Sequence, residues 1–317
     1  MLRIPNLRRT LSAIALSAPL AVSGCIGECP QAPTEDVIIG NMPDAELAPL
    51  VASCKQTQSC EPLCNKVYER EYGSTPDQFE VCELTVSEAN EDMVRFKRFD
   101  QCIGGRRPNG YRPARVAGPV VAAYLAEQAA LEAASVRAFS DLHDDLLALG
   151  APTRLLRAVI AAAADEVRHA TACDELALRY GGSSERRMVA AAPRRSRHQL
   201  AIDNLVEGCV RETYGAVVAG YQARAATDPV VRAAMTVIAR DEAKHAALSW
   251  KLHGWLWPQL SLEERTAALA AAAAARAELV GCGEPDAELR GTVGLPDAIA
   301  AASMLAQLDA TVWTSIA

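Results

Sequence analysis

Two five-residue segments, 165–169 (DEVRH) and 241–245 (DEAKH), repeat the pattern Asp-Glu-x-x-His, and this repeat constrains the fold more than any other feature of the chain. Residues three apart lie on one face of a helix, so the Glu and the His of each segment can bind one metal ion together. Burying a carboxylate and an imidazole is costly unless they pair or bind a metal. The repeat therefore predicts two helices that present matching ligand pairs to one buried metal site.

The sequence around the first segment has the periodicity of a helix that is buried on one face. Apolar residues recur at steps of three and four on the same stripe as Glu166 and His169, whereas Arg168 points away from it. The stripe comprises Leu155, Val159, Ala162, Cys173, Leu176 and Tyr180. Similar patterns and their flanking Gly and Pro residues predict helices at about 119–149, 153–180, 198–226 and 229–254, followed by alanine-rich helices at 261–279 and 296–314.

The two remaining helices of such a site must each supply a carboxylate. Glu132 lies on the apolar stripe of the first helix, where it would otherwise be buried alone. The third helix offers Glu207 and Glu212. Repeat symmetry favours Glu207, because it lies 35 residues before the second Glu-x-x-His pair and Glu132 lies 34 before the first. Glu212 is favoured by its height along the helix pair, because it lies about as far before the turn at 227–229 as the second Glu-x-x-His pair lies after it. Both stay candidates, one as a bridging ligand and the other as a mobile one.

This ligand set resembles that of the ferritin-like di-iron carboxylate superfamily, nearest to its rubrerythrin-type members, over residues 119–253. In that family, two helices each give a Glu and the other two give a Glu-x-x-His pair. The resemblance implies an all-α fold: a ferritin-like four-helix bundle at 113–258, with a long crossover between helices 2 and 3 and two accessory helices within 259–317. The segment 181–196 can form that crossover, since roughly fifteen extended residues reach about 50 Å.

The resemblance also implies the metal and its surroundings. Two iron ions are expected, with manganese as the alternative, because oxygen and imidazole ligands without a thiolate suit these metals. In proteins with this motif each preceding aspartate, here Asp165 and Asp241, hydrogen-bonds a histidine across the bundle. No CxxC pairs follow the bundle, so the rubredoxin-like electron donor of rubrerythrin is missing.

Two further kinds of residue in the helical region are candidates for a place near the metal. Tyr214 is a candidate redox-active or supporting phenol, and a plain core tyrosine is the competing interpretation. Cys173 lies one helical turn beyond His169 and could touch the site, although Cys173 and Cys209 both suit a small space in the core.

The N-terminus has the pattern of a lipoprotein signal peptide at residues 1–24. Arginines 3, 8 and 9 form a basic start, residues 11–22 are apolar, and Val-Ser-Gly-Cys at 22–25 resembles a bacterial lipobox. The resemblance implies lipidation of Cys25, a membrane anchor and a place in the bacterial cell envelope. Because Ile26 rather than an aspartate follows the cysteine, we expect the outer membrane, with the protein facing the periplasm. An ordinary cleaved signal peptide is the alternative.

Residues 25–112 form a separate cysteine-rich module in this interpretation. Its six cysteines beyond the lipobox are predicted to form up to three disulfides of open connectivity, because an exported chain meets an oxidising compartment: Cys29, Cys54, Cys60, Cys64, Cys82 and Cys102. A zinc site is the competing interpretation, but paired CxxC motifs are absent. We expect a helix near 76–99.

Composition agrees with a helical protein and argues against nucleic acid as a partner. Hydrophobic residues make up 50% of the chain, and aromatics only 5%. Alanine, the best helix former, supplies much of the hydrophobic half. The formal charge of −7 is unsuited to binding phosphate backbones.

The function expected from the ligand set is redox chemistry with oxygen or peroxide, as a ferroxidase, peroxidase or oxidase. The residues support the metal site, whereas the reaction and the status of an enzyme rest on family analogy. The alternative is a non-catalytic metal-binding or envelope-interaction lipoprotein that uses the bundle as a scaffold. The sequence names no protein partner and no organic substrate.

Overall fold

The structure is a computed structural model that describes residues 6–19, 34–41, 45–57, 59–72, 79–98, 105–108, 111, 118–182, 193–280 and 285–316. These residues fall into two compact units. One unit comprises the described residues between 34 and 98, and the other comprises the remaining described residues.

The unit at 34–98 mixes helices with a small sheet. Its elements are β1 (Thr34–Ile38), the 3₁₀ turn η1 (Ile39–Asn41), α2 (Leu47–Thr57), α3 (Glu61–Tyr72), β2 (Phe79–Val86) and β3 (Asp92–Arg98). The strands are antiparallel in the order β1-β3-β2. The helix expected near 76–99 is wrong. Val94 and Phe96 are buried while Met93 and Arg95 are half-buried, an alternation with the period of two that favours a strand.

Two disulfides hold this unit together. Cys54 pairs with Cys60, and Cys64 on α3 pairs with Cys82 on β2. Four of the six cysteines predicted to be oxidised therefore form disulfides, beside an apolar core that includes Leu47, Leu63, Val67, Val94 and Phe96. Cys29 and Cys102 lie outside the described residues, as does the predicted lipidation site Cys25.

The second unit is built almost entirely of helices, as its alanine-rich sequence predicts. Its main elements are α4 (Val120–Ala148), α5 (Thr153–Arg179), α6 (Arg197–Asp203), the π-helix η2 (Asn204–Glu212), α7 (Thr213–Ala225), α8 (Pro229–Leu256), α9 (Leu262–Val280) and α10 (Ala298–Thr311). α6, η2 and α7 follow one another without a break, so they form one long helical segment. Residues 183–192, in the predicted crossover, lie outside the described part of the chain.

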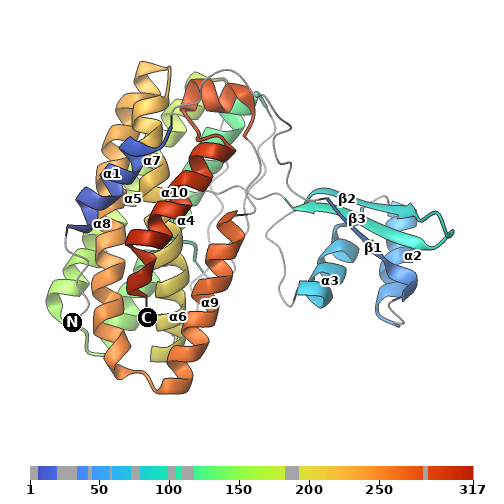
Figure 1. Cartoon of the computed structure of the whole chain (residues 1–317), viewed down its shortest axis with the longest axis horizontal. Helices are drawn as coiled ribbons and strands as arrows, with labels where there is room; N and C mark the ends of the chain where they lie inside the picture. Colours follow the sequence, from blue (N-terminus) through green and yellow to red (C-terminus); the bar gives the residue numbers. More distant parts are fainter. Residues whose placement is uncertain are drawn as a thin grey trace. The chain divides into compact units, whose positions relative to one another are not determined.

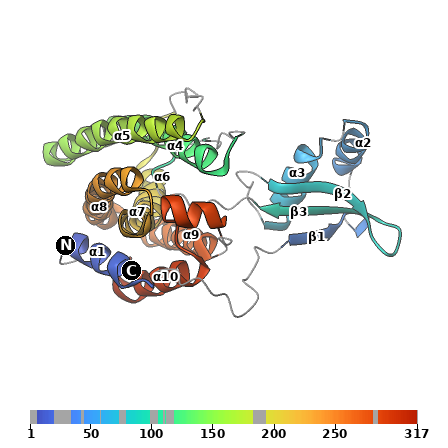
Figure 2. The same cartoon turned by 90° about the horizontal axis from the view of Figure 1, so that it is seen from above.

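The long helices pack in layers (Figures 1 and 2). α4 runs along α5, α7 runs along α8, and α5 and α8 also touch, which joins the two pairs. On the other side of α7 lie α10 and the helix α1 (Leu7–Ser17), and α9 packs against α6 and η2. The outcome is a helical core in which α4, α5, α7 and α8 face one another.

The predicted signal peptide is part of this packing in the full chain. α1 buries Leu7, Leu11 and Ile14 against α7, α8 and α10. The Arg224 guanidinium donates hydrogen bonds to backbone carbonyls at the C-terminal end of α1, including that of Ala18 at 2.8 Å. No helix in the described ranges combines the length and apolarity needed to cross a bilayer.

Candidate metal centre

Three of the long helices carry polar residues between two apolar layers. These polar residues are Glu132 on α4, the Glu166–His169 pair on α5 and the Glu242–His245 pair on α8. One flanking layer contains Leu125, Leu176, Met235 and Ile238, and the other contains Phe139, Val159, Leu248 and Leu252. The antiparallel order of the helices brings the three polar levels together in the interior.

Four of the predicted ligands form one tight group. Single ligand atoms of Glu132, Glu166, His169 and Glu242 all lie within 4.8 Å of one another, and all four side chains are buried. His169 Nδ1 lies 3.3 Å from Glu242 Oε1, 3.5 Å from Glu166 Oε2 and 3.8 Å from Glu132 Oε2. Ligand atoms bound at about 2.1 Å to one metal ion lie about 3.0–3.4 Å apart, so the group has nearly the spacing of a coordination shell.

His245 lies beside this group on its second side. Its Nδ1 is 3.1 Å from Glu166 Oε1 and 3.2 Å from Glu242 Oε1. The carboxylates of Glu166 and Glu242 therefore lie between the two imidazoles, which is where bridging ligands of two metal ions would have to lie.

Each aspartate of the repeated motif faces the histidine of the other helix. Asp165 on α5 lies 3.2 Å from His245 Nε2 on α8, and Asp241 on α8 lies 3.7 Å from His169 Nε2 on α5. The hydrogen bond from His245 lowers the pKa of Asp165, so the aspartate stays charged. Such a carboxylate fixes the tautomer of the ring and leaves Nδ1 facing the site.

The strongest sign that the group fits a metal ion is its unpaired atoms. In the described part of the chain, buried atoms without a hydrogen bond converge here: Glu132 Oε2, Glu166 Oε2, His169 Nδ1, Glu242 Oε1 and His245 Nδ1. Buried polar atoms are nearly always paired, and leaving one unpaired costs about 1–3 kcal/mol or more if charged. Ligand atoms without a hydrogen bond that converge on one place are what a cation would satisfy, once the protons held by the group leave.

The electrostatics of the group also favour a cation. Burial and the neighbouring Glu166 carboxylate raise the pKa of Glu132 well above its ordinary value. Against the effect of burial, the surrounding glutamates raise the pKa of both His169 and His245. The metal-free group therefore holds protons, and these would leave when a metal ion binds.

The two third-helix candidates are not part of this group. Glu207 accepts hydrogen bonds from Arg211 and from the backbone N–H of Arg107 at 3.1 Å. Glu212 is fully buried nearer to the site, where Arg106 Nε lies 3.2 Å from Oε1 and the Ser249 hydroxyl donates to Oε2 at 2.6 Å. All four of their carboxylate oxygens have partners, in contrast with the glutamates of the group.

The π-helix η2 explains why helical periodicity left two candidates on this helix. It includes both Glu207 and Glu212, and π-helical turns often occur at functional sites inside longer helices. Because the turn is wider than 3.6 residues, the residue that faces the interior shifts along the segment. Glu212 is the one that faces the interior here.

The remaining candidates have other surroundings. Tyr214 is buried in the apolar cluster of α1, α7, α8 and α10, and burial raises its pKa above the ordinary range. Cys209 lies in the same cluster. Cys173 instead lines a cavity next to Glu132, where burial raises the pKa of its thiol.

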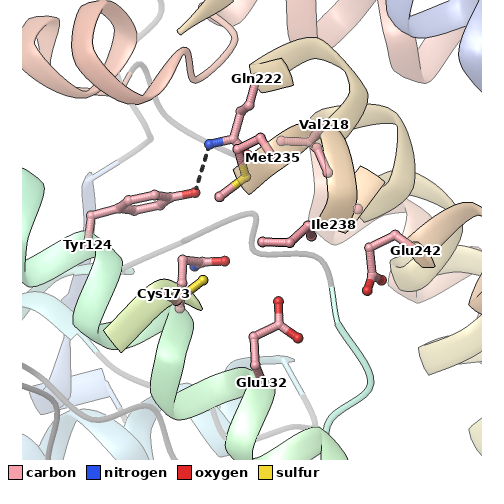
Figure 3. A pocket seen from close by; sticks show the side chains of 11 residues that line it. Tyr124, Glu132, Cys173, Val218, Gln222, Met235, Ile238 and Glu242 are labelled. Atoms are coloured by element: carbon pink, nitrogen blue, oxygen red, sulfur yellow. Dashed lines mark hydrogen bonds between the residues drawn. The ribbon is translucent and has the colours of Figure 1, made fainter. Parts of the chain in front are cut away.

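This cavity lies between α4, α5, α7 and α8 and has a volume of about 30 Å³ (Figure 3). Glu132 and Glu242 point into it, and at its other end Gln222 hydrogen-bonds the Tyr124 hydroxyl at 3.4 Å. One water needs about 10–15 Å³, so the space suits two waters or a molecule with two oxygen atoms.

The sequence interpretation missed the residues around Glu212. Arg106 comes from a turn-rich segment with no periodicity, and it gave no signal of burial. Gly208 gave a weak one, since a glycine inside a helix usually has a packing reason. Ser249 follows His245 by one turn of α8, a spacing that marks a neighbour on the same face.

Comparison with known proteins gives no further guide: no family model, curated protein or solved structure matches this chain.

Proposed function

We propose that this chain is an iron-dependent redox protein of ferritin-like architecture, with manganese as the alternative metal. The observation that carries the proposal is the convergence of unpaired, buried ligand atoms from Glu132, Glu166, His169, Glu242 and His245. Their oxygen and imidazole donors suit iron or manganese. The two Glu-x-x-His pairs offer ligands for up to two ions.

The residues of the chain prepare this site in three ways. Glu132, Glu166, His169 and Glu242 bind the ion, and Asp165 and Asp241 orient the two imidazoles. The apolar layers on both sides keep bulk water away, so charges inside interact more strongly than they would in water.

The proposed reactant is oxygen or peroxide. Bound iron would supply electrons to an O–O bond or take them from a substrate. The adjoining cavity has room for a reactant of this size, and its 30 Å³ is far below the 300–1,000 Å³ typical of pockets for organic ligands. The size of the cavity therefore favours a ferroxidase, peroxidase or oxidase over an oxygenase of organic molecules.

We further propose that the protein acts at the bacterial cell envelope. The two disulfides at 54–60 and 64–82 support an oxidising compartment, since such bonds are rare in reducing ones. The basic and apolar N-terminal sequence and the lipobox support anchoring through Cys25. The substitution Cys25→Ala should release the protein or leave the precursor uncut, and a mature-length chain that still partitions with membranes would contradict the anchor.

The decisive experiment loads the metal-depleted chain with Fe(II) without oxygen and then admits air or peroxide. We expect Fe(II) to bind before the oxidant is added. The absorbance of the bound iron should then change when air or peroxide is mixed in. The double variant Glu166→Ala with Glu242→Ala should bind no iron and keep its helix content, because alanine favours helix and removes buried charge. Iron binding without any response to either oxidant would leave only the non-catalytic metal-binding function.

A matched control removes two exposed glutamates from helices of the same unit. Glu175 on α5 and Glu263 on α9 are both exposed, and their double replacement by alanine should leave iron binding unchanged. If this control loses iron as well, the loss does not report on the centre.

A further inference from the structure

Arg106 is the largest side chain that is fully buried in the described part of the chain, only 1% exposed. It enters the helical unit from the segment 105–108, which precedes α4, and not from any helix. Ser135 on α4 holds its backbone by donating a hydrogen bond to the Arg106 carbonyl at 2.8 Å. A buried guanidinium is stable only when its donors are paired, so its surroundings should be specific.

All three nitrogens of the guanidinium are paired. Nε lies 3.2 Å from Glu212 Oε1, and Nη1 lies 3.2 Å from Asp203 Oδ2. Nη2 donates to Asn204 Oδ1 at 3.2 Å and to Ser249 Oγ at 3.1 Å. The group also lies 5.5 Å from the centre of the Phe139 ring. These contacts come from α6, η2, α8 and α4, and two of these helices, α4 and α8, also carry ligands of the candidate metal centre.

The pocket is shaped for this guanidinium by Gly208 on the π-helix. A Cβ at that position would lie 2.5 Å from Arg106 Nη2 and equally close to the Ser249 Cβ. No other residue type leaves the space free. The glycine, the π-helix and Ser249 therefore act together to admit a buried cation.

This cation pairs with the carboxylate that the second half of a symmetric site would give to a metal ion. Glu212 belongs to the third helix as Glu132 belongs to the first, and the Glu166 and Glu242 carboxylates lie between the two imidazoles. Glu132 has an unpaired oxygen, whereas both oxygens of Glu212 are already bound by Arg106 and Ser249.

We propose that Arg106 withholds Glu212 from a second metal ion, so that the wild-type chain binds one ion, held by Glu132, Glu166, His169 and Glu242. This inference rests on the proposed function, because it concerns the same centre. It narrows that function to the chemistry of a single ion.

The balance of charge agrees with one ion. The group contains three carboxylates, and Glu212 is neutralised separately by Arg106. A divalent ion with one retained proton, or a trivalent ion alone, neutralises three carboxylates. A second divalent ion would add positive charge that the three carboxylates of the group do not balance, at a cost that is large in a buried site.

The test uses the metal-depleted full chain and Mn(II) alone, with bound metal measured by equilibrium dialysis and its coupling measured by electron paramagnetic resonance. We expect one Mn(II) per chain and an uncoupled six-line spectrum for the wild type. Arg106→Met frees Glu212, so it should bind two ions with a coupled spectrum. Arg106→Met with Glu212→Gln removes the freed ligand as well, so it should return to one.

Each result decides between the alternatives. Two coupled ions on the wild type, or one ion on a folded Arg106→Met variant, would overturn the inference while leaving the proposed metal centre intact. No Mn(II) or iron on the wild type would contradict the metal centre itself, and the inference with it. If Arg106→Met does not fold, the wild-type stoichiometry and spectrum decide: one uncoupled ion supports the inference, and two coupled ions overturn it.

Discussion

The two halves of the candidate metal centre carry the same sequence motif, yet their third carboxylates have different partners. The half on α4 and α5 leaves Oε2 of Glu132 without a hydrogen bond, 3.8 Å from His169 Nδ1. In the half on η2 and α8, the corresponding Glu212 is bound by Arg106 and Ser249. A repeated motif thus supplies two similar sets of possible ligands, and a residue from outside the helices pairs with one carboxylate of the second set. The number of possible metal ligands in a sequence therefore sets only an upper limit on the number of metal ions that the folded chain can bind.

The sharpest way to break this comparison is to neutralise the two corresponding glutamates one at a time. Glu132→Gln should weaken binding of the first ion by more than about 100-fold, beyond the 10–100-fold typical of residues that only support a ligand. Glu212→Gln should change it less than about 3-fold, because Glu212 is bound to Arg106 instead of the ion. Competition with a chelator of known affinity measures both. Equal losses for the two variants would show that the halves are alike.

The second prediction concerns the space that admits Arg106. Gly208→Ala should lower the free energy of unfolding by about 3 kcal/mol, because the new Cβ meets the guanidinium and Ser249 in a packed interior. Gly291→Ala is the matched control, since nothing lies within 4 Å of a Cβ there. Urea unfolding of the metal-depleted chains measures the difference. A Gly208→Ala chain as stable as the control would mean that the pocket is not closely fitted.

A third prediction compares the histidines of the centre with His253. Carboxylates raise the pKa of His169 and His245, whereas burial beside Trp250 and Trp257 lowers the pKa of His253 to about 4. Because the folded pKa is below the ordinary 6.5, the unfolded chain binds the proton first. Stability present above pH 6.5 is therefore lost as the pH falls towards 4, by about 2 kcal/mol at pH 5.

The variant His253→Leu isolates this contribution from the other titrating groups. Metal-depleted wild type and variant are unfolded in urea at pH 7.5 and at pH 5, and the change between the two pH values is compared. We expect the variant to lose about 2 kcal/mol less than the wild type over this interval. Equal losses in both chains would show that His253 keeps its ordinary pKa in the folded protein.

How much of this could be predicted from the sequence depends on how local each feature is. The helices that carry Glu132, Glu166 and Glu242 could be predicted because their periodicity extends over several turns. The choice between Glu207 and Glu212 could not, since the π-helix shifts the register that a period of 3.6 assumes. Arg106 was out of reach, because its burial depends on contacts with residues about a hundred positions away.

In the unit at 34–98, the prediction from the sequence failed for a different reason. There the short strands β2 and β3 were mistaken for a helix, although Val94 and Phe96 alternate with more exposed neighbours. Its many charged residues conceal this period, and strands of seven or eight residues offer few repeats to detect it. Cys82 shows the consequence: its pairing with Cys64 depends on how β2 packs beside α3, which the spacing of the cysteines does not contain.

The smallest expected effect separates the two aspartates of the repeated motif. Asp165 accepts a hydrogen bond from His245 at 3.2 Å, whereas Asp241 lies 3.7 Å from His169 and is also paired with Lys244 and Arg240. If one ion binds on the His169 side, Asp241→Asn should weaken it about 10-fold, because the ligand histidine loses its supporting carboxylate. Asp165→Asn should have a smaller effect, because Asp165 supports a histidine that lies beside the ion and is not its ligand. Chelator competition measures the two affinities, and the order matters more than the magnitudes. A larger loss for Asp165→Asn would place the ion on the His245 side, where Arg106 holds the remaining carboxylate, Glu212.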